Sequence, residues 1–424
     1  MRYKFAIIGL GKVGSAMLAL LKEAGHTPVW IVSSKKDTHN IKTFPSIPDN
    51  PMDAHIVFIT VPDSIIPNIA SLIGNIWGDA CRKMTFFHMS GQLTSDILSP
   101  IATHGGEVGS LHPLQSILDP TQAKDSIRKS CFTIEGAPLA VSVARDIVTS
   151  FGSSLIKISA KDKTLYHTAA VIASNYTVSL IAQATDILNE IGMSVNELLP
   201  LIRGTISNIA IYGKSALTGP IQRGDWETVK AHIDELGLKF PDLLGVYQTM
   251  AIYTARLAGK KLPDDLRDIP KILAFEDLVQ RIKALKKRGS KVVFTNGCFD
   301  IIHAGHTSYL RQAKSLGDFL VVGLNSDASV KRLKGGARPV NDQYSRAVIL
   351  SCLSMVDYVT IFDQDTPYDL IVAICPDILV KGGDWSPSEI VGSDIVRSYG
   401  GDVLTIPFIE GYSTSDIIEK IKKS

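Results

Sequence analysis

The chain has 424 residues, of which 45% are hydrophobic and 20% are charged, and its formal net charge is +2. This length exceeds one ordinary domain and predicts two or three, with a composition typical of soluble globular proteins. So small a net charge gives no reason to expect a nucleic-acid partner.

The first predicted elements are a strand over 3–8, a glycine turn and a helix over 15–24. The glycine spacing is that of a dinucleotide fingerprint: the first glycine makes the turn, the second admits the pyrophosphate, and the third lets helix and strand pack. We therefore expect a cofactor site made by the residues of this turn, Gly9, Gly11, Lys12, Val13 and Gly14.

The next predicted strand, over 27–32, ends in Ser33, Ser34 and Lys35. An NAD enzyme usually has a carboxylate here to hold the ribose hydroxyls, whereas hydroxyl groups and a lysine suit a 2′-phosphate. This favours NADP over NAD. The alternative is a polar loop that touches no cofactor.

Two later strands also run into polar turns, which contain Ser90 and His112. In an open parallel sheet, ligands bind beyond the carboxyl ends of the strands. We expect Ser90 to contact the cofactor and His112 to contact a substrate. For His112, a role in satisfying its own loop is an equal alternative.

From residue 160 to about 258 the pattern becomes helical. Lys163, His167 and Ser174 recur at helical spacing and share one face, and Asn175 lies on its edge. Such a polar stripe on an apolar helix suits a substrate site. The alternative is a buried hydrogen-bond network at a dimer interface.

The strings GLGKVG, TVPD, HMSG, SLHPLQS, YHTAAVIASN and ALTGPIQRGD together resemble an uncharacterised Rossmann-like family related to pyrroline-5-carboxylate and ketopantoate reductases. The resemblance implies a Rossmann domain over 1–158 and a helical domain over 159–260 that dimerises and contributes to the substrate site. It also implies that Val61 and Pro62 line the cofactor, that Lys163 and His167 handle protons, and that Asn175 contacts the substrate. It implies no particular substrate.

A polar, proline-containing stretch over 259–269 predicts a linker, after which a strand over 291–295 leads into His303-Ala-Gly-His306 at a helix start. Two imidazoles three residues apart point toward one pocket, Gly305 leaves room for a ligand, and the free N–H groups of the first turn favour an anion. The pattern predicts a nucleotide whose α-phosphate is attacked while His303 and His306 stabilise the developing charge. A buried histidine pair is the alternative.

The strings TNGCFDIIHAGH, GLNSD, RLKG, RPVN, DTP, LVKGGDW and GYSTS resemble the HxGH nucleotidyltransferase superfamily, and in particular the adenylyltransferase domain of the bacterial bifunctional heptose enzyme. The resemblance covers 268–424 and implies a doubly wound α/β domain. It also implies transfer from ATP to D-glycero-β-D-manno-heptose 1-phosphate, giving pyrophosphate and ADP-heptose, a lipopolysaccharide precursor. The sugar kinase that usually accompanies this domain has no counterpart in the N-terminal half.

Within this domain we expect Lys334, with Lys331, to hold the β- and γ-phosphates, and Mg²⁺ to be carried by ATP and water with no protein metal site. Asp300 would orient the pocket or the sugar. For Arg338 and Arg346, substrate binding and a surface ion pair are both open. The other expected nucleotide-binding residues are Thr295, Asn296, Gly297, Cys298, Phe299, Gly305, Asn325, Asp327, Lys381, Gly382, Asp384, Ser413, Thr414 and Ser415.

Three functions compete. The first is a sugar-phosphate adenylyltransferase fused to an NADP-dependent reductase. The second is a cytidylyltransferase of the same fold acting on glycerol 3-phosphate or a similar alcohol phosphate. In the third, the N-terminal half is a non-catalytic module that senses a cofactor or dimerises.

The five cysteines show no CxxC or Cys/His metal spacing, which favours reduced thiols. The sequence contains no signal-peptide pattern and no apolar run long enough for a membrane span. We therefore expect a cytoplasmic protein, a homodimer, with no membrane partner.

Overall fold

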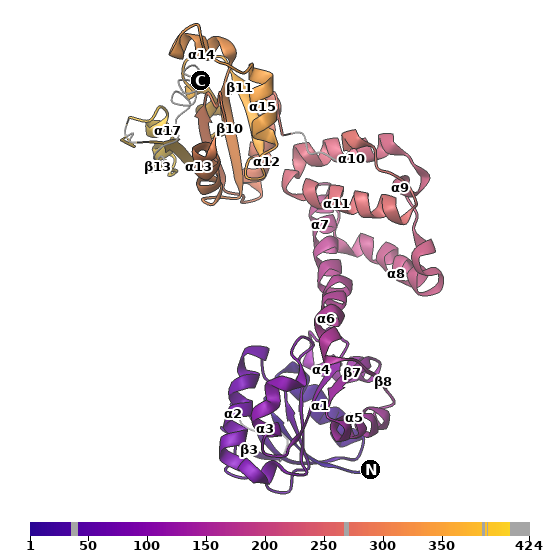
Figure 1. Ribbon diagram of the computed structural model, residues 1–424. Coiled ribbons are helices and arrows are strands. Elements are labelled where there is room, and N and C mark those ends of the chain that lie inside the picture. Colours follow the sequence, from indigo (N-terminus) through magenta and orange to yellow (C-terminus); the bar gives the residue numbers. More distant parts are fainter. Residues whose placement is uncertain (35–40, 267–270, 384–385, 388, 408–424) are drawn as a thin grey trace, which may run out of the picture. The chain divides into compact units, whose positions relative to one another are not determined.

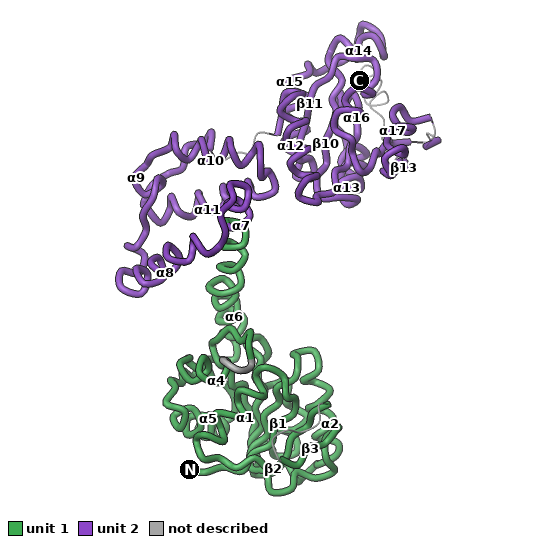
Figure 2. The backbone as a smooth tube through the Cα atoms, turned by 180° about the vertical axis from the view of Figure 1, so that it is seen from behind, with its two compact units in different colours: residues 1–184 green, residues 185–424 purple. Residues whose placement is uncertain are grey.

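The computed structural model describes residues 1–34, 41–266, 271–383, 386–387 and 389–407. The chain divides into two compact units, Met1–Ala184 and Thr185–Ser424 (Figure 2). The predictions made for Lys35, Asp384, Ser413, Thr414 and Ser415 concern residues outside the described part. The predicted domain limits near 158 and 260–268 remain predictions.

The first unit is built on an eight-stranded sheet with the order β3-β2-β1-β4-β5-β6-β7-β8 (Figure 1). The first six strands in this order run parallel and have the Rossmann arrangement, so the predicted fold class is confirmed. β7 runs antiparallel to β6, which the sequence did not predict. The strands are β1 Lys4–Ile8, β2 Thr27–Val32, β3 Lys42–Phe44, β4 Ile56–Ile59, β5 Thr85–His88, β6 Glu107–Pro113, β7 Cys131–Gly136 and β8 Ser154–Lys157.

Helices cover both faces of this sheet. Alternate strand residues pack on opposite sides: Phe5 and Ile7 belong to the cluster with α1 and α5, whereas Ala6 and Ile8 belong to the cluster with α2. This is why the strands are almost continuously apolar. The helices are α1 Lys12–Glu23, α2 Ile66–Trp77, α3 Ser99–Ala102, α4 Pro120–Arg128 and α5 Pro138–Ser150.

The helical region begins with α6 Lys163–Val171, a π-helical turn at Ile172–Tyr176 and α7 Thr177–Asn189, and the division between the units falls within α7. The residues expected to share one face of α6 are less exposed than their neighbours. In the second unit, Ser194 and Glu197 form a capping box at the start of α8. The helices that follow are α8 Val195–Tyr212, α9 Pro220–Arg223, α10 Trp226–Lys239 and α11 Pro241–Leu257.

The second unit also contains a five-stranded parallel sheet with the order β11-β10-β9-β12-β13. This doubly wound order confirms the predicted C-terminal fold. One face packs against α12 and α16, and the other against α13 and α15. The elements are α12 Phe275–Lys287, β9 Val292–Gly297, α13 Ala304–Lys314, β10 Phe319–Asn325, α14 Asp327–Lys334, α15 Gln343–Ser351, β11 Tyr358–Phe362, α16 Tyr368–Ile374, β12 Ile378–Gly382, α17 Ser393–Ser398 and β13 Asp402–Ile406.

Both sheets reverse their winding direction at one point, between β1 and β4 in the first and between β9 and β12 in the second. The crevice beyond the carboxyl ends of the strands at such a point is where ligands bind in open α/β sheets. Across the described residues, no helix has both the length and the apolar character that a membrane span requires.

Candidate functional site

The turn after β9 brings the two predicted histidines together. The chain reverses at Phe299, whose φ is 43°, and His303 is the N-cap residue of α13. The imidazole rings of His303 and His306 are stacked, with centroids 3.9 Å apart, and the Phe299 ring lies 5.3 Å from that of His306. Both imidazoles therefore occupy one site at the amino end of a helix.

Burial decides the charge of these rings. Together with the nearby charges of His303 and Lys334, it lowers the pKa of His306 to about 4. Burial also lowers the pKa of His303. His306 is therefore neutral near pH 7, and its buried Nδ1 has no hydrogen-bond partner among the described residues. A neutral imidazole can donate one hydrogen bond to a phosphate oxygen, and an anion beside the ring would raise its pKa again.

A lysine bridges the two strands at the point where the winding reverses. Lys381, near the end of β12, donates to Oδ1 of Asn296 at 3.0 Å and lies 3.3 Å from its carbonyl oxygen. Burial lowers the pKa of Lys381. The bridge thus links the carboxyl ends of β9 and β12. A Cβ on Gly297 would lie 3.0 Å from the Phe299 ring, so a larger residue there would press on the turn.

Two expected nucleotide-binding side chains use their polar atoms within the protein. The hydroxyl of Thr295 lies 2.6 Å from that of Tyr309, and Thr295 is completely buried. The amide of Asn325 donates to Ser329 at 3.0 Å, and Asn325 is 3% exposed. In this structure both side chains therefore use these polar atoms for contacts within the protein.

The two arginines differ. Arg338 is mostly covered and pairs with Asp300, so it is not a surface ion pair. Arg346 is completely buried and contacts Asp327, which excludes a surface ion pair there too. Asn341, which the string RPVN contains but no site prediction named, donates to Asp300 and accepts from Arg346.

The remaining predicted residues of this site are placed as follows. Lys331 and Lys334 lie exposed in the last turn of α14. Gly305 lies in the first turn of α13, and Gly382 ends β12. The carbonyl of Cys298 accepts from Arg346 at 2.6 Å. Over the described ranges, no group of three or more His, Cys, Asp or Glu residues could hold a metal ion.

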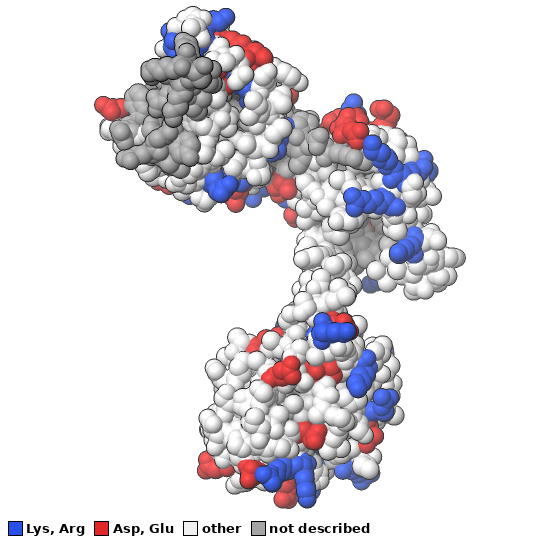
Figure 3. All heavy atoms as spheres, viewed as in Figure 1, with Lys and Arg blue, Asp and Glu red and all other residues white. Residues whose placement is uncertain are grey.

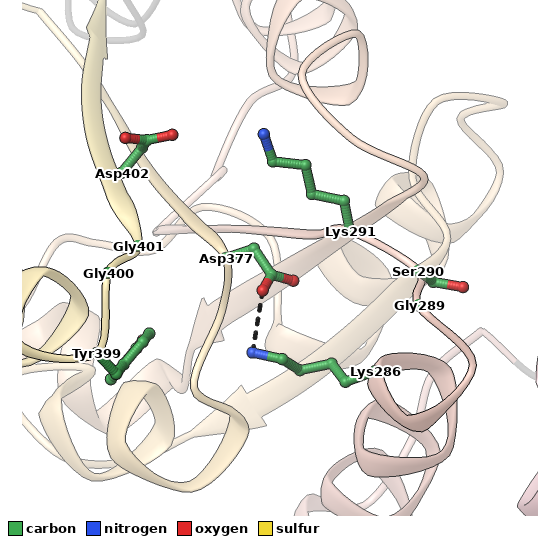
Figure 4. A pocket seen from close by; sticks show the side chains of 9 residues that line it. All are labelled: Lys286, Gly289, Ser290, Lys291, Asp377, Tyr399, Gly400, Gly401 and Asp402. Atoms are coloured by element: carbon green, nitrogen blue, oxygen red, sulfur yellow. Dashed lines mark ion pairs between the residues drawn. The ribbon is translucent and has the colours of Figure 1, made fainter.

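A cleft of about 490 Å³ lies at the opposite, amino-terminal edge of this sheet (Figure 4). The ammonium group of Lys286 is 3.1 Å from a carboxylate oxygen of Asp377 and also donates to the carbonyl of Cys375, so its charge is already satisfied. This cleft is separate from the histidine pair. Its lining residues are Lys286, Gly289, Ser290, Lys291, Asp377, Tyr399, Gly400, Gly401 and Asp402.

In the first unit, the three glycines of the N-terminal turn have three different surroundings. Gly9 has a φ of 100°, which suits glycine. A Cβ on Gly14 would lie 2.0 Å from the carbonyl oxygen of Gly9, so the helix packs there on bare backbone. Around Gly11, nothing lies within 4 Å of such a Cβ. The open position is the one expected to admit a pyrophosphate.

This turn starts its helix earlier than the sequence predicted. Gly11 is the N-cap residue of α1, which begins at Lys12 and not at residue 15, because the turn itself already has helical geometry. Lys12 is exposed and Val13 is partly buried. The hydroxyl of Thr60, which sequence reasoning missed, donates to the carbonyl of Gly9 at 2.5 Å and joins the ends of β1 and β4.

The residues expected near the cofactor ribose follow β2. The amide of Ser33 donates to Phe44 at 3.0 Å, and Ser34 is exposed. Val61 and Pro62 follow β4 at the same edge of the sheet. This edge is the one expected for a dinucleotide.

Lys163 lies buried at the strand ends, with 1% of its surface exposed. It donates to the carbonyl of Ser90 at 2.9 Å and to the hydroxyl of Ser110. Burial lowers its pKa to about 8, while Glu135 and Asp63 act in the opposite direction. The hydroxyl of Ser90 donates to Asp63 at 2.6 Å. Lys163 thus fastens the start of α6 to β5 and β6 and can exchange a proton near neutral pH.

Two histidines adjoin this lysine. The rings of His112 and His167 lie 6.4 Å apart, and a Cβ on Gly91 would lie 2.7 Å from Nδ1 of His167. Nδ1 of His112 is 2.8 Å from the hydroxyl of Tyr166, and burial lowers the pKa of His112 to about 4. Asn175 is exposed and lies eight residues beyond His167, or roughly 12 Å along the helix. The structure therefore gathers the predicted residues except Asn175.

Four further members of this cluster were missed. Asp63, Gly91, Ser110 and Tyr166 meet the predicted residues from separate segments. Tyr166 could have been found from its place beside His167. The others follow only from strand order.

Family models match three separate stretches of the chain. Residues 1–113 match a Rossmann-like domain, 130–254 match the domain of unknown function DUF2520, and 294–420 match a cytidylyltransferase-like family. The C-terminal domain is of the nucleotidyltransferase type. The N-terminal half is Rossmann-like.

Curated relatives agree for the C-terminal domain. The bifunctional protein HldE of Wolinella succinogenes is 58% identical over 149 residues, which cover 35% of this chain and 31% of that protein. HldE of Syntrophotalea carbinolica is 45% identical over 190 residues, which cover 45% of this chain and 36% of that protein. The chain thus spans about a third of the length of the relatives it matches.

Solved structures match the N-terminal half. Protein TM1727 from Thermotoga maritima is 26% identical with a TM-score of 0.50, covering 60% of this chain and 98% of that one. Protein BF3122 from Bacteroides fragilis, provisionally an NADP oxidoreductase, is 17% identical with a TM-score of 0.50 and the same coverage. The second likeness supports the fold alone.

Proposed function

We propose that the C-terminal domain transfers the adenylyl group of ATP to D-glycero-β-D-manno-heptose 1-phosphate or a similar sugar 1-phosphate. A phosphate oxygen of the sugar bonds to the α-phosphorus while the bond to the β-phosphate oxygen breaks, and pyrophosphate leaves with the electron pair. The observation that carries the proposal is the stacked pair of His303 and His306 at the amino end of α13. The similarity to HldE supports the choice of substrate.

The groups around the histidine turn have different roles in this reaction. The His306 ring can donate a hydrogen bond, and the N–H groups of α13 add the helix dipole, so charge that develops on the α-phosphate meets donors already in place. Lys334, close enough to His306 to lower its pKa, stabilises the β- and γ-phosphates and the leaving pyrophosphate. Mg²⁺ would neutralise phosphate charge, held by ATP and water. The reason for assigning the ion to ATP and water is that the described residues contain no group of carboxylates able to hold it.

The test is release of pyrophosphate by the full chain from ATP, with a panel of sugar 1-phosphates as acceptors. We expect turnover with ATP and heptose 1-phosphate. The cytidylyltransferase alternative is favoured by the family model for 294–420. It predicts turnover with CTP and glycerol 3-phosphate instead, and that result would replace the proposal.

For the N-terminal half, we propose an NADP-dependent reductase. The open position at Gly11 suits a pyrophosphate, and the hydroxyls of Ser33 and Ser34 suit a 2′-phosphate. Lys163, with a pKa of about 8, and His167 would handle the proton that accompanies hydride transfer. Oxidation of NADPH in a screen of carbonyl and imine substrates tests this. NADP binding without hydride transfer would favour a sensing module.

We also propose that the chain forms a cytoplasmic homodimer through its helical region. In the first unit, Leu165 is 73% exposed and Val178 is 67% exposed; in the second, Leu201 on α8 is 67% exposed. Figure 3 shows few charged side chains over α6. Exposed apolar surface on this scale favours a protein partner. Light scattering of the purified chain measures the mass, and a monomer at micromolar concentration would contradict the proposal.

A further inference from the structure

Asp300 is a buried carboxylate that precedes His303 by three residues. Asp300 is 3% exposed, and its side chain accepts three hydrogen bonds: from Nε of Arg338 at 2.6 Å, from the amide of Val340 at 2.8 Å and from the amide of Asn341 at 3.0 Å. Its own carbonyl accepts from the Asn341 side chain at 2.8 Å. Three of the roughly four acceptor positions of the Asp300 carboxylate are therefore used, and its contacts hold one segment, residues 338–341.

Arg338 is anchored by only one of its nitrogens. Nε contacts Asp300, and the side chain makes no other hydrogen bond to the described residues. The side chain is 15% exposed, while residues 335–337 before it are exposed. An anchor at Nε leaves both terminal nitrogens as a fixed fork, the geometry that matches two oxygens of a phosphate.

Arg346 is the opposite case. Its Nε donates to the carbonyl of Asn341 at 3.0 Å, Nη1 to the carbonyl of Cys298 at 2.6 Å, and Nη2 to Asp327 at 2.7 Å. It is completely buried. All three nitrogens are used, and they tie the end of the 338–341 segment to the turn after β9 and to the start of α14. The segment that carries Arg338 is thus held from two sides.

We propose that the fork of Arg338 binds a phosphate group at the reacting centre, and that Asp300 and Arg346 are positioning residues that hold it there. This rests on the proposed transferase function. Positioning supplies much of the acceleration in phosphoryl-type transfer, and a displacement of about 1 Å can cost on the order of a hundredfold. If Asp300 served only to close the turn, hydrogen bonds from the amides of Val340 and Asn341 would be enough, and its ion pair with Arg338 would not be needed.

The test compares Arg338→Gln, Arg338→Lys and Asp300→Asn with the wild-type full chain. A matched control is Arg332→Gln, because Arg332 is an exposed arginine whose ion pair with Asp365 lies outside this segment. Pyrophosphate release gives kcat and the KM for each substrate, and thermal unfolding reports stability.

We expect Arg338→Gln to raise one KM by roughly tenfold or more with little change in the unfolding temperature. Arg338→Lys should restore part of that loss, because lysine keeps the charge and lacks the fork. Asp300→Asn should raise the same KM, and the double variant Arg338→Gln with Asp300→Asn should show less than the sum of the two effects, because Asp300 acts through Arg338. A raised KM for the sugar phosphate assigns the acceptor phosphate, and a raised KM for ATP assigns the nucleotide. If both KM values stay at the level of the control, the inference is wrong.

Absence of turnover by the wild type would count against the proposed function alone. Calorimetric titration of the wild type and Arg338→Gln with inorganic phosphate and with pyrophosphate then decides the inference. Weaker binding by the variant supports an anion site at Arg338. Equal affinities, or no binding by the wild type, overturn it.

Discussion

The two sheets carry a turn suited to phosphate at the same topological point, but the side chains around the two turns differ. In the first unit the turn is bare backbone: Gly11 is open and Gly14 packs against Gly9. In the second unit the corresponding turn gathers His303 and His306. A backbone cradle holds a phosphate, whereas neutral imidazoles and nearby cations can stabilise charge that appears on it. The side chains beyond the strand ends, and not the fold, therefore distinguish the two turns.

The largest effect is expected at the turn of the second unit that carries His303 and His306. His306→Ala should lower kcat for pyrophosphate release by roughly a hundredfold or more, because the transition state loses a fixed donor in a covered site. The exposed His232, in the same unit, is a matched control as His232→Ala. Near-normal turnover by a folded His306→Ala variant would remove this ring from the mechanism.

At the glycine turn of the first unit, effects on packing can be separated from effects on cofactor binding. Gly14→Ala would place a Cβ 2.0 Å from the carbonyl oxygen of Gly9, so it should both lower the unfolding temperature and abolish NADP binding. Gly11→Ala meets no protein atom, so it should leave stability almost unchanged and still weaken NADP. Calorimetry and thermal unfolding measure the two quantities. Unchanged NADP affinity in Gly11→Ala would show that no ligand occupies this space.

Cofactor choice should respond to one side chain. Ser33→Asp adds a carboxylate at the end of β2, which repels a 2′-phosphate and accepts hydrogen bonds from ribose hydroxyls. We expect the ratio of NADP to NAD affinity to fall by about tenfold, the size of one charged hydrogen bond. Titration of both cofactors into wild type and variant measures the ratio. A wild type that prefers NAD would contradict the premise.

The smallest expected effect is the pH dependence of stability that His306 causes. The pKa of His306 is lowered to about 4 in the folded chain, so the unfolded chain binds more protons between pH 6.5 and 4. Stability from the neutral ring is therefore complete above pH 6.5 and is lost as the pH falls toward 4. His306→Gln should lose less stability than the wild type over this window, measured by thermal unfolding at stepped pH. Parallel curves would mean that the ring titrates normally.

Much of this architecture was readable from local patterns. Strands of continuous apolar residues, a glycine turn before a helix and two histidines three residues apart each act within a few neighbouring residues, and their physical meaning does not depend on distant parts of the chain. This is why both α/β folds and the histidine pair were predicted, and why the roles of Gly9, Gly11 and Gly14 match their surroundings.

Tertiary structure decided which polar side chains remain open to a ligand. Asp300 meets Arg338 across 38 positions and Lys163 meets Ser90 across 73, and no local pattern specifies such pairs. Arg338 and Arg346 are both arginines near one motif, yet among the described residues Arg338 pairs through Nε alone, whereas Arg346 uses all three of its nitrogens. The reason is physical: a buried charge must find partners, and the strand order determines which partners are within reach.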